Sequence, residues 1–422
     1  MKTTTRFITA LVLLESASAW QLHEWGTFTT VSGSDGVLLS GLQREEETLP
    51  PFVHSHFGME NGQIPPMEGV NRILQRHGTL GFSPPLSKGF GERPVANVTV
   101  KMETPVIYFH SEKAFQANVK VGFEGGTISQ WYPARSGGEI LPEPEAPADP
   151  VKSPTPLEKW TIDFSKPYRG GIEWKVDVLS PEESANTLTF KPKDSVNWLR
   201  ARVPEANVVR TAEGELENYL FYRGIGNFTP GLVTRVSSDE TLLLENQTSG
   251  VIPYALAFES KQGRIRWLEL PGGIAKGGGA TITETQWQEA PGGFSTPIYQ
   301  SLRKGLAGSG LTHAEADAMI QTWWSSYFER DGLRVFWIVP REVTDRILPL
   351  SVDPAPETIV RTLVGRSEVL RPSLEREWLA ASRKTGNEAY PWQSLVNSDR
   401  FGLAIQERIR AITSQTAGAS SH

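Results

Sequence analysis

Cysteine is absent from the 422-residue sequence, which excludes disulfides and thiolate metal sites. Secreted eukaryotic proteins of this length usually carry disulfides, so the absence favours a bacterial protein of the envelope or the exterior. Clusters of Lys and Arg are also lacking and the formal net charge is −6, which argues against a nucleic-acid partner. No segment beyond residue 19 is apolar over the roughly 20 residues that a membrane span needs, so we expect a soluble mature protein.

The N-terminus has the three parts of a secretory signal peptide. Lys2 and Arg6 form a short positive region, and residues 7–14 form an apolar core. Ala17-Ser18-Ala19 then supplies the small-x-small pattern that signal peptidase recognises. We therefore expect cleavage after this motif, a mature chain that starts at Trp20, and export to the periplasm or the exterior.

The mature chain divides into three zones by composition and periodicity. Residues 20–97 are rich in Gly, Pro and His with little periodicity, and we expect them to pack on the next zone. Residues 98–290 contain many short alternating runs, which predict a β-sandwich-like domain with an exposed Pro-rich loop at 133–156. Residues 296–415 have mainly helical periodicity, and residues 416–422 are small and polar, as in a disordered tail. The predicted fold class is mixed α+β, with a β-sandwich-like central domain followed by a helical C-terminal region.

Several local patterns make sharper predictions. Residues 119–132 contain two alternating runs around Gly125-Gly126, which predict a β-hairpin. Thr312-His-Ala-Glu315 is a capping box and predicts the start of a helix. Residues 334–339 are typical of a buried strand, and residues 356–363 are read as a helix.

The stretch His23-Glu-Trp-Gly-Thr-Phe-Thr29 resembles the hallmark of a family of exported bacterial proteins with no assigned function. Four later segments are similar to that family as well, namely Met102–Phe109, Phe221–Phe228, Val339–Arg341 and Asp345–Leu350. The resemblance covers nearly the whole mature chain. It implies export, and it implies no activity, cofactor or catalytic residue.

Histidine is scarce, with seven residues in the chain, and five of them precede the Pro-rich loop: His23, His54, His56, His77 and His110. The i, i+2 spacing of His54 and His56 places both rings on one face of an extended segment. With a third ligand from His23, His77 or Glu24, they could hold Zn²⁺ with an open position for water. The metal would lower the pKa of that water towards 7, and Glu24 is the candidate catalytic base. Alternatively, these are surface or hydrogen-bonded histidines without a metal.

Tryptophan is abundant, with 13 residues, and six lie in the β zone: Trp131, Trp160, Trp174, Trp198, Trp267 and Trp287. Exposed indoles on a sandwich could stack on sugar rings. Those that share a strand face with Ile, Phe and Val are expected to fill the core instead. Charged residues within apolar runs, such as Glu103, Arg223 and Arg341, are likewise expected to form internal ion pairs or caps.

Known catalytic signatures are not convincing in this chain. Ser301-Leu-Arg-Lys304 and Lys384-Thr-Gly386 mimic penicillin-binding motifs but have no Ser-x-Asn between them, and no G-x-S-x-G elbow occurs. Three hypotheses therefore stay open. The first is an exported envelope or ligand-binding protein, with a polysaccharide or an envelope protein as partner. The second is a metal-dependent hydrolase that uses His54 and His56, with His23 and Glu24. The third is a structural component of an envelope assembly.

Overall fold

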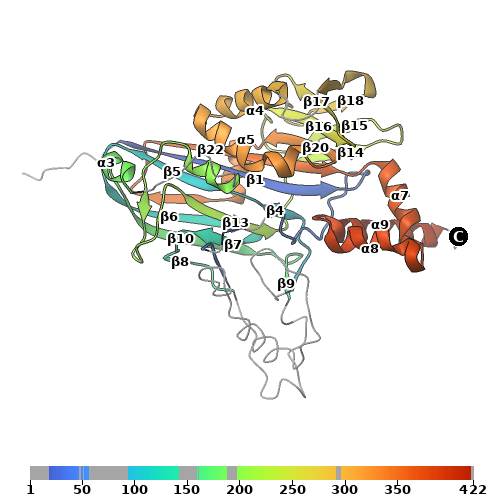
Figure 1. Cartoon of the computed structure of the whole chain (residues 1–422), viewed down its shortest axis with the longest axis horizontal. Coiled ribbons are helices and arrows are strands. Elements are labelled where there is room, and N and C mark those ends of the chain that lie inside the picture. The colour runs from blue at the N-terminus through green and yellow to red at the C-terminus, as the bar shows by residue number, and fades with distance from the viewer. Residues whose placement is uncertain are drawn as a thin grey trace, which may run out of the picture.

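Two large β-sheets form the centre of the molecule, with helices over one outer face and beyond one end (Figure 1). The computed structural model describes residues 19–46, 49–50, 52–56, 94–141, 159, 161–187, 197–290 and 296–419. His77, Trp160 and most of the Pro-rich loop lie outside these ranges.

The larger sheet has eleven strands drawn from the whole length of the chain. They are β1 (Trp20–Ser32), β2 (His54–Ser55), β4 (Val100–Met102), β5 (Val106–Ser111), β7 (Gly126–Tyr132), β13 (Leu220–Gly226), β16 (Ala255–Lys261), β17 (Arg264–Leu270), β19 (Gln288–Ala290), β20 (Gly332–Ile338) and β22 (Thr358–Val369). Their order is β19-β17-β16-β20-β22-β1-β4-β13-β7-β2, and β5 pairs with both β1 and β13. Strand β1 is parallel to β22 and antiparallel to β5, so it lies in the middle of the sheet.

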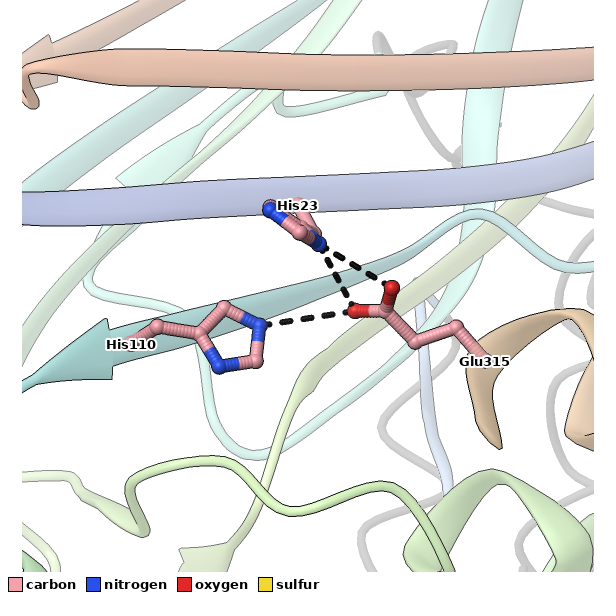
Figure 2. Close-up of side chains that lie close together, drawn as sticks. All are labelled: His23, His110 and Glu315. Carbon is pink, nitrogen blue, oxygen red and sulfur yellow. Dashed lines mark hydrogen bonds and ion pairs between the residues drawn. The ribbon is translucent and has the colours of Figure 1, made fainter. Parts of the chain in front are cut away.

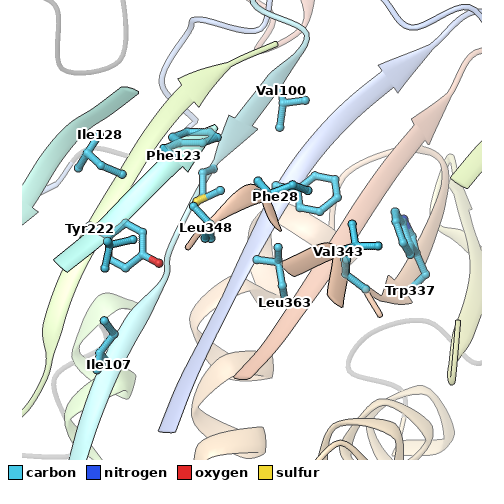
Figure 3. Packing of buried hydrophobic residues seen from close by; sticks show 14 of the residues in the cluster. Phe28, Val100, Ile107, Phe123, Ile128, Tyr222, Trp337, Val343, Leu348 and Leu363 are labelled. Atoms are coloured by element: carbon cyan, nitrogen blue, oxygen red, sulfur yellow. The ribbon is translucent and has the colours of Figure 1, made fainter. Parts of the chain in front are cut away.

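The second sheet has six strands and packs against the inner face of the first. They are β6 (Phe115–Glu124), β8 (Gly137–Gly138), β10 (Arg169–Val178), β11 (Val209–Arg210), β12 (Leu216–Glu217) and β21 (Leu350–Asp353). Alternate residues of β6 and β10 are buried, among them Val119 and Trp174, and they meet Phe28, Tyr222 and Trp337 of the larger sheet in one apolar core. Figure 3 shows part of this core, in which side chains from both layers interdigitate. The arrangement is that of a β-sandwich.

Smaller elements complete the described part. Strands β14 (Leu232–Val236), β15 (Leu242–Asn246) and β18 (Gly279–Ile282) form a three-stranded sheet, and β3 (Val95–Ala96) pairs with β9 (Ile162–Asp163). The helices are α3 (Pro181–Ala185), α4 (Thr296–Gly308), α5 (His313–Phe328), α6 (Arg341–Ile347), α7 (Pro372–Ser382), α8 (Tyr390–Ser398) and α9 (Gly402–Ala419). Short 3₁₀ turns are η2 (Asn197–Arg202), η3 (Glu284–Gln286) and η4 (Gly386–Ala389). None of the helices described is long and apolar enough to cross a membrane.

Helices α4 and α5 cover the outer face of the larger sheet, as Figure 1 shows. Trp25, Tyr108 and Phe336 of the sheet pack there against Trp323 and other aromatic residues of α5. Because β1 has cores on both faces, every residue except Gln21 is buried. This explains why the sequence of this segment lacks the alternation of a half-exposed strand.

The mixed α+β class is confirmed, with sheets dominating the N-terminal and central parts and helices towards the C-terminus. The predicted zones do not fold separately, however. Residues 20–97 supply the central strand β1 of the larger sheet, and the C-terminal zone supplies β20, β21 and β22. Residues 416–419 continue helix α9, where we predicted the start of a disordered tail.

The hairpin predicted for residues 119–132 is wrong. Strand β6 pairs with β10 and β21, whereas β7 pairs with β13 and β2 in the other sheet. The chain crosses between the sheets at Gly125, which has φ +83° and would place a Cβ only 2.6 Å from the carbonyl oxygen of Asn227. Alternation identified the buried face of each strand but could not identify its partner.

The helix predicted for residues 356–363 is also wrong, because this segment forms β22. It pairs in parallel with β1 over twelve residues, from Thr358 to Val369. Most of the strand is buried, so it too lacks a clean period of two. The predicted strand at 334–339 is confirmed as β20, and the capping box is confirmed as the start of α5.

Buried aromatic and charged residues have the structural roles that were expected. Trp131 and Trp174 lie in the core between the sheets. The guanidinium of Arg223 lies 2.6 Å from Glu45, as expected for an internal ion pair. Arg341 differs from the expectation, because it is exposed and pairs with Asp345 on the surface of the same helix.

Candidate metal centre

Three metal-capable side chains from distant parts of the chain converge on the outer face of the larger sheet. They are His23 of β1, His110 of β5 and Glu315 of α5, and one ligand atom from each lies within 4.8 Å of the other two. Figure 2 shows the three side chains pointing towards one another across the space between the sheet and the helix. Among the described residues, no other group of three or more His, Asp or Glu side chains has the spacing of metal ligands.

Strand pairing brings the two histidines together. In the antiparallel ladder of β1 and β5, His23 lies opposite Tyr108, so His110 is its diagonal neighbour two residues further along. Diagonal neighbours share one face of a sheet and lie within reach of long side chains. The ring centroids of His23 and His110 are 4.6 Å apart with an interplanar angle of 62°.

The capping box of α5 positions the carboxylate. Thr312 accepts a hydrogen bond from the backbone N–H of Glu315, and its own N–H and hydroxyl donate to Glu315 Oε2 at 2.8 and 2.9 Å. The carboxylate is therefore held in one orientation at the positive end of the helix dipole. Packing of the aromatic face of α5 on the sheet then brings it to the histidines.

The distances within the group suit a shared proton or a metal ion. His23 Nδ1 lies 3.0 Å from both carboxylate oxygens of Glu315, and His110 Nε2 lies 3.4 Å from Oε1. Ligand atoms that bind Zn²⁺ tetrahedrally at about 2.0–2.1 Å lie roughly 3.3 Å from one another. The two contacts therefore already have nearly the spacing of the edges of a zinc coordination tetrahedron.

Burial and charge make the group a strong cation site. The side chain of Glu315 is fully buried and that of His23 nearly so, whereas 26% of the His110 side chain is exposed. Burial by itself raises the pKa of Glu315, but hydrogen bonds from His110 and His23 outweigh it and hold the pKa well below its usual range. The site thus presents an anionic carboxylate and two imidazoles, with the Nε2 atom of His110 buried beside the carboxylate while part of its ring is exposed.

His23 is the member of the group that was predicted as a ligand, and the predicted base Glu24 is not beside it. As the next residue of β1, Glu24 points to the opposite face of the sheet, where it forms a buried ion pair with Arg361. Tyr222 donates a hydrogen bond to its other oxygen at 2.5 Å. A carboxylate with both oxygens engaged in the core is a structural residue and not a base for the metal centre.

His54 and His56 also lie apart from the group. They belong to β2 and the turn after it, at the edge of the sheet, four strand positions from β1, which is roughly 19 Å at the usual strand spacing. His54 Nε2 lies 2.9 Å from Glu215, and His56 donates to the carbonyl oxygen of Ile128. The predicted combination of these residues with His23 is therefore not formed, and the reading of them as hydrogen-bonded histidines fits.

His110 and Glu315 were missed as ligands for different reasons. His110 was counted among the N-terminal histidines, but the pairing of β5 with β1 that aligns it with His23 has no signal in the sequence. Glu315 was recognised as the acidic residue of a capping box, and nothing in that motif indicates which surface the helix end will meet.

Comparison of the chain with protein-family models and with curated proteins finds no match to either.

Proposed function

We propose that the protein is an exported metal-dependent hydrolase in which His23, His110 and Glu315 bind one divalent transition-metal ion. The observation that carries the proposal is the convergence of three ligand atoms within 4.8 Å of one another. Two imidazole nitrogens and one carboxylate oxygen are the donor set of catalytic zinc sites of the His₂Glu type.

The number of ligands favours a catalytic ion over a structural one. Structural zinc sites are closed by four protein ligands, whereas catalytic sites use three and leave a position for water. The group in the described residues has three protein ligands, which leaves a fourth coordination position for water. A water bound there would have its pKa lowered towards 7 and would supply a hydroxide nucleophile at neutral pH.

Thr312 supports this role because it orients the carboxylate of Glu315. Its two hydrogen bonds to Oε2 fix the carboxylate, while Oε1 faces both histidines. Ligands of catalytic metals are commonly oriented in this way by hydrogen bonds from a second layer of residues. Export is part of the proposal because residues 1–19 have the pattern of a cleaved signal peptide.

The test is elemental analysis of the mature protein, secreted from its own signal peptide and purified without a His-tag. We expect about one equivalent of zinc or another transition metal in the wild type. The His23→Ala and Glu315→Gln variants should lose it, and the His54→Ala/His56→Ala double variant should keep it as the matched control. Absence of metal from wild type reconstituted with zinc, iron or manganese would overturn the proposal, as would loss of metal in the double variant alone.

A second measurement separates hydrolysis from mere binding. Chromogenic ester, phosphodiester and peptide substrates would be offered to the metal-loaded and the chelator-stripped protein. Turnover that depends on metal and disappears in His110→Ala is the expected result. A loaded protein without turnover on any of these bonds would leave metal binding standing and remove the hydrolase.

A further inference from the structure

A second site lies at the other end of helix α5. A cavity of about 770 Å³ opens between the end of the larger sheet and helices α7, α8 and α9, which extend beyond the sheet in Figure 1. Ser326 near the C-terminal end of α5 lines it, whereas Glu315 of the metal centre is in the first turn. These residues are eleven positions apart, or roughly 16 Å along the helix, so the two sites are separate.

Several positive charges in the cavity wall are already paired. Arg400 lies 2.8 Å from Glu46, and Arg371 lies 2.6 Å from Glu259. Arg44 donates to two backbone carbonyl oxygens, of Val396 and Asp399. Seven acidic side chains line the cavity beside five basic ones, and this excess of negative charge disfavours phosphate or a carboxylate as the ligand.

One buried carboxylate of the wall keeps capacity to accept hydrogen bonds. Although burial raises it, Arg366, Lys101 and Arg400 hold the pKa of Glu46 well below its usual range, and the pKa of Glu368 is lowered by the neighbouring arginines in the same way. Both oxygens of Glu46 are occupied by these cationic groups, whereas the arginine contacts of Glu368 all fall on Oε1 and leave Oε2 to accept. Glu368 therefore offers a buried acceptor to a ligand with hydroxyl donors.

The helical side of the cavity also contributes apolar side chains, including an indole. Trp378 and Leu374 of α7, Leu395 of α8 and Ile405 of α9 line the cavity there, and Trp378 is half-buried. A purely apolar ligand would fit these residues but would leave the charged wall without water or partners. A ligand with hydroxyls on its edge and C–H groups on its face satisfies both kinds of lining.

We propose that this cavity binds a neutral saccharide, with one ring stacked on Trp378 and its hydroxyls directed to Glu368. Pockets of 300–1,000 Å³ between structural modules are the usual places for such ligands. The charged residues that line the cavity have both signs, Lys261, Arg330 and Glu377 among them, so the lining presents no uniform charge that would select a charged sugar. The proposal does not depend on the metal centre.

The test is saturation-transfer NMR on the full mature protein with neutral trisaccharides, one each of α-1,4-glucan, β-1,4-glucan, β-1,3-glucan, β-1,4-mannan and N-acetylglucosamine. At least one should show transfer, strongest at the C–H protons of a single ring. Trp378→Ala should weaken its affinity about tenfold or more. Leu374→Trp, which narrows the cavity on the same helix and keeps the indole of Trp378, should weaken binding as well.

Trp392→Ala is the matched control, since Trp392 packs in the same helical module and does not line the cavity. Binding should persist in this variant and in the metal-free Glu315→Gln protein. Absence of transfer from every sugar, or affinity unchanged in both Trp378→Ala and Leu374→Trp, would overturn the proposal.

Discussion

Glu315 serves the helix and the histidines at the same time. Its carboxylate closes the capping box with Thr312 and accepts hydrogen bonds from His23 and His110. Because the folded state depresses its pKa, ionised Glu315 stabilises the fold above its unfolded pKa of about 4.3. That contribution is lost as the pH falls below this value towards the folded pKa.

We therefore expect the free energy of unfolding of the metal-free protein to decrease as the pH is lowered from about 5. In Glu315→Gln this part of the pH profile should be flatter, since the amide does not titrate. Urea unfolding at a series of pH values measures both curves. Parallel curves for the two proteins would contradict the assignment.

Glu24 was the candidate base, and its surroundings give it a different role. It is buried, pairs with Arg361 across β1 and β22, and accepts from Tyr222. Removal of one partner of a buried ion pair leaves an uncompensated charge and commonly costs about 3–5 kcal/mol.

Arg361→Ala should accordingly lower the free energy of unfolding by about 3–5 kcal/mol, while any of this protein that folds keeps its metal. A Glu24→Leu/Arg361→Met double variant should recover much of the loss. Chemical denaturation combined with elemental analysis gives both quantities. Loss of the metal from a normally folded Glu24→Leu/Arg361→Met protein would contradict this and show that Glu24 contributes to metal binding.

At the scale of the element, helix α5 was predicted correctly, whereas β22 was predicted as a helix. The start of α5 follows from a capping box four residues long, and its aromatic face follows from helical spacing, so both signals are local. Strands β1 and β22 are buried on both faces, and β6 and β7 belong to different sheets. The partners of these strands therefore depend on contacts between residues that are far apart in the sequence. The sequence therefore predicted the class of fold and His23, but not the pairing that adds His110 and Glu315.

Thr312 links the stability of α5 to the site. Thr312→Ala should cost about 1 kcal/mol through loss of the cap, and it should weaken metal binding because the carboxylate loses one of its two orienting donors. The matched control is Thr283→Ala, which removes the hydroxyl of the capping box of η3, next to strand β19 at the far edge of the larger sheet. Calorimetric titration with zinc should distinguish them; equal metal affinities in the two variants would exclude a positioning role for Thr312.

At the scale of the whole molecule, the metal centre joins three segments that are remote in sequence. His23 and Glu315 are 292 positions apart. His23 lies on the larger sheet, and Glu315 lies on the helix that packs on this sheet. An ion bound there would stabilise the folded state against the unfolded one by mass action, by about 2.7 kcal/mol at a free metal concentration one hundred times the Kd.

A chelator should thus lower the melting temperature of the wild-type protein and of His54→Ala/His56→Ala, and should leave that of His23→Ala unchanged. Differential scanning calorimetry with and without EDTA makes the comparison. Equal chelator effects in all three proteins would show that any bound ion is held elsewhere.

The position of β1 has a bearing on how the protein could be made. Trp20 is packed against Phe109 and Phe115, and its carbonyl oxygen accepts from the backbone of Glu357, so the first residue after the proposed cleavage point is enclosed in the finished molecule. Ala19 is exposed, but a peptidase that binds an extended segment on both sides of the bond would also have to draw Trp20 out of the sheet. If the chain is exported as proposed, removal of the leader would therefore precede folding. The central strand would then stay unpaired on one side until β22, 337 positions further along the chain, had followed it across the membrane.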